Sequence, residues 1–304
     1  MKKVFAVLLA ALLLLSGAAC AEKTGEMTLS APNGAPAIAV AGLALENPEA
    51  FTFVDAETIA AEFANATHDF IIAPVNAGAK LFKAGKSTYR LAAVITWGNL
   101  VFASQKKDFS LESINGSALT LFGENTINAS VARYVLEKKE IQPASTEYLA
   151  GAANTQQLLL SDPEAVVLTA EPAVTAAKIK NEAVTSIPLN EVLGEITGVD
   201  GFTQAGLFVK EETLKADAAA VDAYLERIRQ AADMAVNDLE TLANASVELG
   251  ILPNAKVAVS AIPNCGIRYV SAAEAKEWVA ITAGMDLSQF GGEVPSDDFY
   301  YAGE

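Results

Sequence analysis

Asparagines recur in the turns that follow the strand-like segments of this 304-residue chain. An asparagine side chain both donates and accepts hydrogen bonds, so it can orient a polar ligand without adding a charge. Asparagine is also a common helix cap and turn former, because its side chain accepts bonds from free main-chain amides. Both interpretations stay open for each single asparagine. The residues that we predict to contact a ligand are Asn33, Gly34, Asn76, Trp97, Asn125, Thr126, Asn154 and Glu171.

Catalytic and metal-binding arrangements are hard to assemble from the residue types present. The single histidine, His68, begins a strand-like segment, and the chain has neither a Gly-x-Ser-x-Gly elbow nor a Gly-x-x-x-x-Gly-Lys-Ser/Thr loop. Two cysteines, Cys20 and Cys265, exclude a disulfide framework and a cysteine-based zinc site. We therefore expect no catalytic residue, no metal and no cofactor.

The charge balance excludes another class of function. Asp and Glu number 37 against 21 Lys and Arg, a net charge of −16. A nucleic-acid-binding protein normally carries a basic footprint, so we expect no nucleic-acid partner. The ligand-contacting turns contain neither lysine nor arginine, which disfavours a strongly anionic ligand.

The N-terminal segment has the order of a secretory signal: two lysines, the apolar run Val4–Leu15, and small residues that end at Cys20. Twelve apolar residues are too few to cross a bilayer, which needs about 20. Small residues followed by cysteine resemble a lipobox, although Gly17 stands where leucine is usual. We expect residues 1–19 to be a signal peptide, which lowers the net charge to −18 when removed, and residues 20–26 to be a tether lipidated at Cys20. Ordinary cleavage near Ala19 or Ala21 is the alternative.

Strand-like segments alternate with helical ones over most of the chain. This alternation predicts βαβ units with largely parallel sheets, whose strands end at a common edge where ligands bind. The expected strands are Met27–Ala31, Phe51–Val54, Asp69–Ala73, Leu91–Thr96, Ala118–Phe122, Ser145–Leu149, Ala165–Thr169 and Val184–Pro188, with a later one at Gly201–Lys210.

The C-terminal third is predicted to be mostly helical. Residues 211–250 carry apolar positions at helical spacing, with a break expected at Asn237–Asp238. A further helix is expected over 271–284, where Ser271 and Glu274 form a capping box.

Four segments resemble one family. They are Ser113–Gly123, which resembles a passage that opens the second lobe; Thr169–Pro172, a Trp/Glu-Pro turn; 208–240, a return strand and long helix; and Gly291–Tyr301, a Gly-Gly-x-x-Pro closing segment. Together with the N-terminal segment, they resemble solute-binding lipoproteins of ABC importers, of the type 2 group that serves nitrate, taurine, alkanesulfonates and thiamine pyrimidine precursors. The cysteine-rich motif of the related pyrimidine synthases is absent, and no basic residue is placed to hold sulfonate or nitrate, so the solute is not carried over.

The resemblance implies an α/β, two-lobed periplasmic-binding-protein type 2 (Venus-flytrap) fold, with a mixed sheet in each lobe and a two-strand hinge. Mapped onto this chain, lobe 1 covers residues 27–103 and 207–304, and lobe 2 covers 104–206. The hinge strands would be Leu100–Gln105 and Thr203–Val209.

The function that the resemblance implies is capture of a small polar solute between the lobes, by a monomer anchored outside the cytoplasm that delivers the solute to an ABC permease and its ATPase. Two alternatives stay open. One is an enzyme of the same fold that acts on a small metabolite, for which Glu124 and Glu171 are the candidate titratable pair. The other is a ligand sensor for a membrane receptor.

Overall fold

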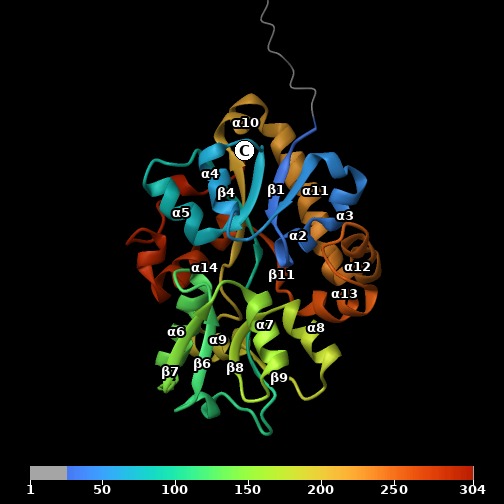
Figure 1. Cartoon of the computed structure of the whole chain (residues 1–304). Coiled ribbons are helices and arrows are strands. Elements are labelled where there is room, and N and C mark those ends of the chain that lie inside the picture. Colours follow the sequence, from blue (N-terminus) through green and yellow to red (C-terminus); the bar gives the residue numbers. More distant parts are fainter. Residues whose placement is uncertain (1–25, 304) are drawn as a thin grey trace, which may run out of the picture.

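The structure is a computed structural model that describes residues 26–303. The predicted signal peptide, Cys20 and nearly all of the predicted tether lie outside the described residues. Two sheets, each covered by helices on both faces, form two lobes that lie one above the other (Figure 1). Among residues 26–303, no helix combines the length and the apolar character needed to span a bilayer.

The first lobe is built on a six-stranded sheet of order β11-β4-β10-β3-β1-β2. Strand β1 is parallel to β2 and β3, whereas β10 is antiparallel to β3 and β4, and β11 is antiparallel to β4. The strands are β1 Leu29–Pro32, β2 Phe51–Val54, β3 Phe70–Pro74, β4 Tyr89–Thr96, β10 Ala205–Lys210 and β11 Ile267–Ser271.

The second lobe is built on a five-stranded sheet of order β7-β6-β8-β5-β9. Strand β6 is parallel to β7 and β8, and β5 is antiparallel to β8 and β9. The strands are β5 Leu100–Ser104, β6 Ala118–Phe122, β7 Ser145–Leu149, β8 Val166–Ala170 and β9 Thr185–Pro188.

The helices fall into layers that follow the apolar faces of the two sheets. In the first lobe, α2, α3, α11 and α12 pack on one face, and α4, α5 and α14 on the other. In the second lobe, α6 and α9 cover one face, and α7 and α8 the other. The α-helices are α2 Ala35–Ala39, α3 Ala41–Glu46, α4 Glu62–Asn65, α5 Val75–Lys83, α6 Ile127–Lys138, α7 Ala152–Ser161, α8 Ala173–Lys180, α9 Leu189–Thr197, α10 Glu211–Ala216, α11 Ala218–Asn237, α12 Leu239–Glu248, α13 Ala255–Ala261 and α14 Ala272–Met285.

Short 3₁₀ turns complete the chain, and two of them lie near the junction of the lobes. These are η4, Ile262–Asn264, after α13, and η5, Leu287–Phe290, after α14. The remaining turns are η1 Pro48–Ala50, η2 Ile59–Ala61, η3 Glu112–Ile114 and η6 Asp297–Phe299.

The chain crosses between the lobes at two adjacent segments, residues 97–99 and 201–204. Main-chain bonds hold them together: Phe202 N donates to Trp97 O (3.2 Å), and Gln204 N donates to Thr96 O (3.0 Å). Gly201 has φ +105°, and a Cβ there would lie 2.2 Å from Trp97 O. Only glycine fits such a contact without moving the main chain.

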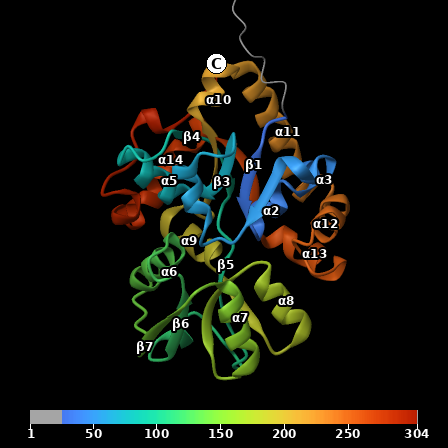
Figure 2. The ribbon, with the colours of Figure 1, turned by 45° about the horizontal axis from the view of Figure 1, so that its top comes forward.

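One apolar cluster continues from lobe to lobe through these crossings. It joins Phe208 of the first sheet to Phe102 of the second by way of buried Trp97, Leu100 and Phe202. The lobes also touch on both flanks, where α13 packs against α8 and α14 against α6, as Figures 1 and 2 both show.

Most of the predicted strands are confirmed to within one or two residues. The mixed sheets that the resemblance implied are also confirmed. The largely parallel pairing predicted from alternation holds only for β1–β3 and β6–β8, because the strands on either side of the crossings run antiparallel to their neighbours. The division at residues 103/104 and 206/207 stays a proposal; the sheets place Leu100–Ser104 wholly in the second lobe.

The helical C-terminal third is also as predicted in outline. The break at Asp238 is present, and the Asp238 side chain caps α12 by accepting from Thr241 N. A second break at Asp217, which caps α11 in the same way, was not predicted. Ser271 caps α14 as predicted, by accepting from Glu274 N, and its hydroxyl donates to Glu274 Oε2 (2.7 Å). The Glu274 side chain thus bonds the Ser271 hydroxyl and not the Ser271 main-chain amide, so the reciprocal bond of the expected capping box is not formed. Strand β11 was not predicted.

Candidate functional site

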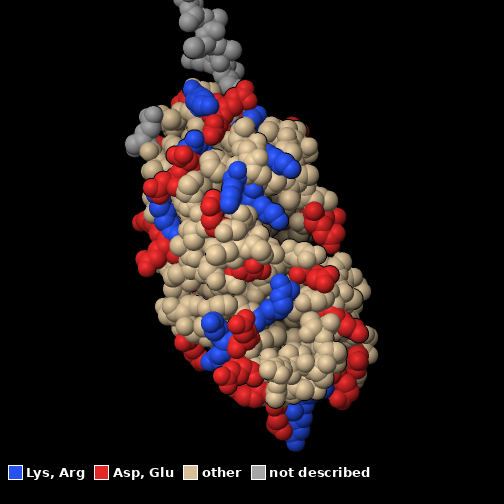
Figure 3. Space-filling model, turned by 90° about the vertical axis from the view of Figure 1, so that its left-hand side faces the viewer, with Lys and Arg blue, Asp and Glu red and all other residues tan. Residues whose placement is uncertain are grey.

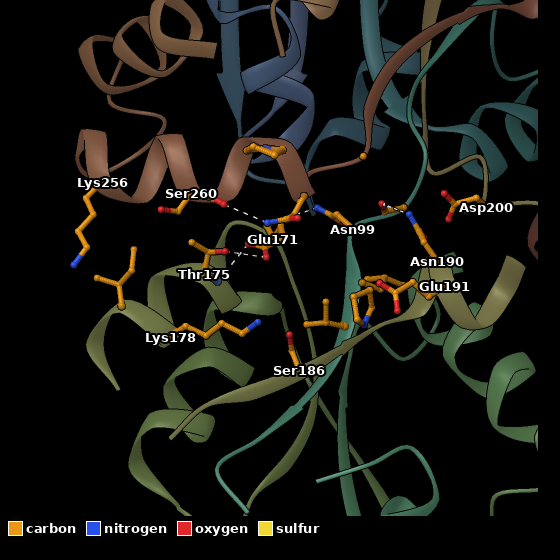
Figure 4. A pocket seen from close by; sticks show the side chains of 18 of the residues that line it. Asn99, Glu171, Thr175, Lys178, Ser186, Asn190, Glu191, Asp200, Lys256 and Ser260 are labelled. Carbon is orange, nitrogen blue, oxygen red and sulfur yellow. Dashed lines mark hydrogen bonds between the residues drawn. The ribbon is translucent and has the colours of Figure 1, made fainter. Parts of the chain in front are cut away.

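A cavity of about 710 Å³ lies between the two lobes, beside the first crossing segment. This volume is within the usual range for small-molecule sites, roughly 300–1,000 Å³. Figure 4 shows α13 along one rim, α8 along the opposite rim, and Asn190, Glu191 and Asp200 at one end. Its lining comes from both lobes: Gly98, Asn99, Leu100, Val101, Glu171, Thr175, Lys178, Ile179, Glu182, Ser186, Pro188, Asn190, Glu191, Asp200, Lys256, Ser260, Pro263, Asn264 and Gly266.

Glu171 is the most buried charged residue of this lining, with 7% of its surface exposed. It follows β8 directly, and a cis peptide bond joins it to Pro172 before α8 begins. Its carboxylate accepts from the Thr175 hydroxyl (2.9 Å) and from Thr175 N (3.3 Å), and so caps the first turn of α8. Glu171 N donates to Asn99 O (2.9 Å) and the Asn99 side-chain amide donates to Glu171 O (2.7 Å), so two bonds fix the Glu171 backbone on the crossing segment.

Burial raises the pKa of the Glu171 carboxyl above its usual value, because an apolar surrounding disfavours the charged form. The two bonds from Thr175 and the charge of Lys178 oppose this effect in part. No ion pair joins Glu171 to a basic side chain within residues 26–303. The cavity therefore contains a carboxyl group whose charge the protein only partly compensates.

Three asparagines line the cavity, and the amide nitrogen of each donates a hydrogen bond to a main-chain carbonyl. Asn99 donates to Glu171 O (2.7 Å), and Asn264 donates to Ser260 O (3.2 Å). Asn190 donates to both Trp97 O (3.2 Å) and Gly98 O (2.9 Å). Asn190 Oδ1 is buried and accepts no hydrogen bond from any described residue.

Charged side chains surround the buried part of the cavity. Lys178, Lys256, Glu182, Glu191 and Asp200 line it and are all exposed. In Figure 4 the two lysines lie toward one end and Glu191 and Asp200 toward the other. Elsewhere on the surface, Figure 3 shows acidic and basic side chains intermixed on one face, without a single basic patch.

A second group of polar side chains, which we call the amide cluster, adjoins the cavity at Asn99. Gln204 Nε2 donates to Asn99 Oδ1 (2.9 Å) and to Asn128 Oδ1 (3.1 Å), and so links the second crossing to α6. Asn76 donates to Gln289 Oε1 (3.2 Å) and follows Val75, whose amide donates to Gln204 O. The amide cluster consists of Asn76, Asn99, Asn128, Gln204 and Gln289.

A further polar contact joins the lobes beyond the amide cluster. The Ser130 hydroxyl of α6 donates to Asp286 Oδ2 (2.7 Å), and Arg133 donates to the same hydroxyl (2.9 Å). Desolvation raises the pKa of Asp286, but the bonds from Ser288 and Ser130 and the charge of Arg133 outweigh it and lower the pKa overall. This contact involves side chains of both lobes and so depends on their arrangement.

Of the eight predicted ligand-contacting residues, only Glu171 lines the cavity. Asn76 belongs to the amide cluster. Trp97 is 3% exposed; Arg268 lies 4.3 Å over its ring, Trp278 packs edge-on against it, and its Nε1 donates to Arg268 O. Trp97 is therefore packed between other side chains at the junction.

The other predicted residues lie at helix starts. Gly34 precedes α2, and Asn33 beside it is exposed. Thr126 precedes α6, and its hydroxyl donates to Gly123 O (2.7 Å). Asn154 accepts from Gly151 N (3.2 Å) in the first turn of α7. Exposed Asn125 completes the set, and a ligand-binding role for these five residues stays a prediction.

The positions of the acidic side chains bear on the enzyme alternative and on metal binding. Glu124 does not line the cavity with Glu171, so this cavity does not bring the candidate titratable pair together. Among residues 26–303, no group of three or more His, Cys, Asp or Glu side chains is placed to hold a metal ion.

The cavity residues that the sequence did not indicate are chiefly Asn99, Asn190 and the residues of α13. Asn99 lies three residues after the predicted strand Leu91–Thr96, so its position after a strand is a signal that the sequence contains. Asn190 and Ser260 lie inside or beside helices, and their relevance comes from packing between the lobes.

Comparison with solved structures identifies the fold of this chain. No protein-family model and no curated protein matches the sequence. Among solved structures, an ABC transporter protein from Parabacteroides distasonis is similar, with a TM-score of 0.78 and 22% identity over 91% of this chain and 99% of that chain. The periplasmic aliphatic sulphonate binding protein SsuA from Escherichia coli is similar with a TM-score of 0.70 and 12% identity over 92% of this chain and 94% of that one.

A third structure, the Candida albicans CA3427 gene product, is described as having the generic periplasmic binding protein fold. It matches with a TM-score of 0.56 and 11% identity over 90% of this chain and 93% of that chain. The two-lobed periplasmic-binding-protein fold expected from the sequence is therefore confirmed.

Proposed function

We propose that this protein is the solute-binding component of an ABC importer, which captures a small polar solute between its lobes and delivers it to a membrane permease. The observation that carries the proposal is the cavity itself, because residues of both lobes line it around the crossing segments. The structural neighbours described as ABC transporter and sulphonate-binding proteins support it.

The mechanism is reversible capture. A solute that contacts both lobes favours the conformation in which the lobes lie together, by as much as its affinity for that conformation exceeds its affinity for others. Within residues 26–303, the chain passes between the lobes only at residues 97–99 and 201–204, so these crossings are where the backbone would adjust. The permease would then recognise the liganded arrangement.

The residues that we propose to contact the ligand are Glu171, which lines the cavity, and the other residues predicted from the sequence. Glu171 contributes from the second lobe within the cavity. Asn33, Gly34, Asn76 and Trp97 are assigned to the first lobe, and Asn125, Thr126 and Asn154 to the second, on the basis of the sequence.

The cellular location is part of the same proposal. Lipidation at Cys20 after cleavage of residues 1–19 would hold a monomer at the outer face of the cell membrane. The expected result is a protein in the membrane fraction that a Cys20→Ala substitution releases. Mass spectrometry of the N-terminal peptide would identify a lipid directly, and ordinary cleavage would leave an unmodified peptide.

A thermal-shift screen tests the binding function. The chain from residue 21 onward would be screened against amino acids, sulfonates, pyrimidines and polyamines. A ligand at 100 times its dissociation constant is expected to add about 2.7 kcal/mol to the free energy of unfolding. Asn125→Ala and Glu171→Ala are each expected to weaken the shift; if neither does, the second-lobe assignments are wrong.

Incubation of the bound solute with the protein separates a receptor from an enzyme. We expect the solute to be recovered unchanged. Formation of a product would instead support the enzyme alternative.

A further inference from the structure

The asparagine side chains of the cavity differ in how their amide nitrogens and their oxygens are bonded. The amide nitrogens of Asn99, Asn190 and Asn264 all donate to main-chain carbonyls. Asn190 Oδ1, by contrast, is buried without a partner among the described residues. A buried acceptor without a donor is unfavourable, by about 1–3 kcal/mol, so a ligand that brings a donor there gains affinity.

Glu171 adds a second acceptor group. Its two carboxylate oxygens accept one bond each from Thr175, whereas a carboxylate can accept about four. With 7% of its surface exposed, this group has little water to complete its bonding. A hydrogen bond to a charged group contributes more than one between neutral groups, so Glu171 is the strongest potential anchor in the cavity.

The charged side chains of the lining also favour a ligand that donates hydrogen bonds. Four carboxylates, Glu171, Glu182, Glu191 and Asp200, line the cavity against the two lysines Lys178 and Lys256. Both lysines are exposed, as are Glu182, Glu191 and Asp200, so water screens all of these charges. Lys178 lies close enough for its charge to act on Glu171, but neither lysine forms an ion pair with the Glu171 carboxylate, which is the one buried charge of the lining. Arginine is the residue best suited to a sulfonate or carboxylate, and none of those in the described part of the chain lines the cavity.

We propose that the solute of this cavity is a small organic cation, an amine whose N–H groups donate to Glu171 and to Asn190 Oδ1. Glu191 and Asp200 at one end of the cavity add to the attraction (Figure 4). This inference rests on the proposed receptor function, and it separates this chain from its structural neighbours that are described as sulphonate-binding proteins.

The first test compares ligands by charge class. Thermal shifts of the chain from residue 21 onward would be measured with three amines (1,4-diaminobutane, agmatine and spermidine), with amino acids, with uncharged pyrimidines and with alkanesulfonates. We expect an amine to raise the melting temperature and the alkanesulfonates to leave it unchanged. Shifts caused only by the other classes would overturn the inference and leave the receptor function supported. No shift from any class would contradict both.

The second test removes single charges without changing side-chain size. By calorimetry with the amine that gives the largest shift, Glu171→Gln is expected to weaken binding by about tenfold to a hundredfold. Asp200→Asn, at an exposed position, is expected to weaken it by about two- to fivefold.

The matched control is Glu147→Gln, which removes an exposed carboxylate on β7, in the same lobe but outside the cavity lining. It is expected to bind like the unsubstituted protein. Equal affinity of all three variants would overturn the inference. If Glu171→Gln does not fold, the comparison of Asp200→Asn with Glu147→Gln still decides.

Discussion

The amide cluster and the cavity adjoin each other at Asn99, yet they use similar residue types in opposite ways. In the amide cluster, the amide nitrogen of Gln204 donates to two asparagine oxygens and so links the second crossing to α6. In the cavity, the amide nitrogen of Asn190 donates to main-chain carbonyls, and its Oδ1 accepts no hydrogen bond from the described residues. The hydrogen-bond partners of an amide side chain therefore decide whether it links the lobes, as Gln204 does, or keeps an acceptor without a partner among the described residues, as Asn190 does.

Charge separates the two regions further. The amide cluster contains no ionisable side chain, whereas the cavity has four carboxylates and two lysines in its lining. Neutral amides can be buried at a junction at little cost once their bonds are made, but a buried carboxylate such as Glu171 keeps a desolvation cost. We therefore expect substitutions in the amide cluster to lower stability, and substitutions in the cavity to change binding.

The largest expected effect lies in the crossing that both regions share. Gly201→Ala places a Cβ against Trp97 O in a left-handed backbone conformation, and we expect it to lower the free energy of unfolding by about 2–4 kcal/mol. Denaturant unfolding monitored by circular dichroism would measure the loss.

The control is Gly116→Ala, at a glycine that also has positive φ but has no atom near its Cβ position. This variant is expected to lose about 1–2 kcal/mol, from the backbone conformation alone. Equal losses at both positions would mean that the contact with Trp97 is not close.

A smaller effect is expected in the amide cluster. Gln204→Ala removes the donor to Asn99 and Asn128, and we expect a loss of about 1–3 kcal/mol by the same measurement, because it leaves partly buried acceptors unbonded. Asn125→Ala, at an exposed position, is the control and is expected to stay within about 0.5 kcal/mol. A loss for Gln204→Ala no greater than that of the control would remove the structural distinction between the two regions.

The smallest effect is expected at Glu171 without ligand, and it depends on pH. Because burial raises the folded-state pKa of Glu171 above 4.5, the unfolded chain ionises first as pH rises, and stability is lost between 4.5 and the folded pKa. Lys178, on the same helix, and the buried thiol of Cys265, from the first lobe, are the titratable groups near it.

Glutamine does not titrate, so Glu171→Gln escapes this loss. We expect its melting temperature, relative to the unsubstituted protein, to be higher at pH 8 than at pH 4. A higher melting temperature together with weaker amine binding would show that the Glu171 carboxylate stabilises the bound ligand and destabilises the ligand-free fold. A difference in melting temperature that does not change with pH would contradict the raised pKa.

The sequence by itself determined most of the secondary structure, because alternating apolar segments and capping residues act locally. The two-lobed fold with mixed sheets followed from the resemblance of four segments to one family, whereas the alternation alone predicted largely parallel sheets. Strands β2, β6 and β7 have the predicted bounds, and Ser271 begins α14 as its pattern indicates. The short strand β11, at the edge of the first sheet, was not recognised in the sequence.

Only the tertiary structure decided which polar residues meet. Glu171, Asn190 and Ser260 come from three distant parts of the chain and line one cavity because α13 of the first lobe packs against α8 of the second. Trp97 has the type and position of a ligand contact in the sequence, and it is the packing at the junction that places Arg268 over its ring and Trp278 edge-on against it. Residue type and spacing place a side chain at the end of a strand, whereas the packing of the two lobes determines what that side chain faces.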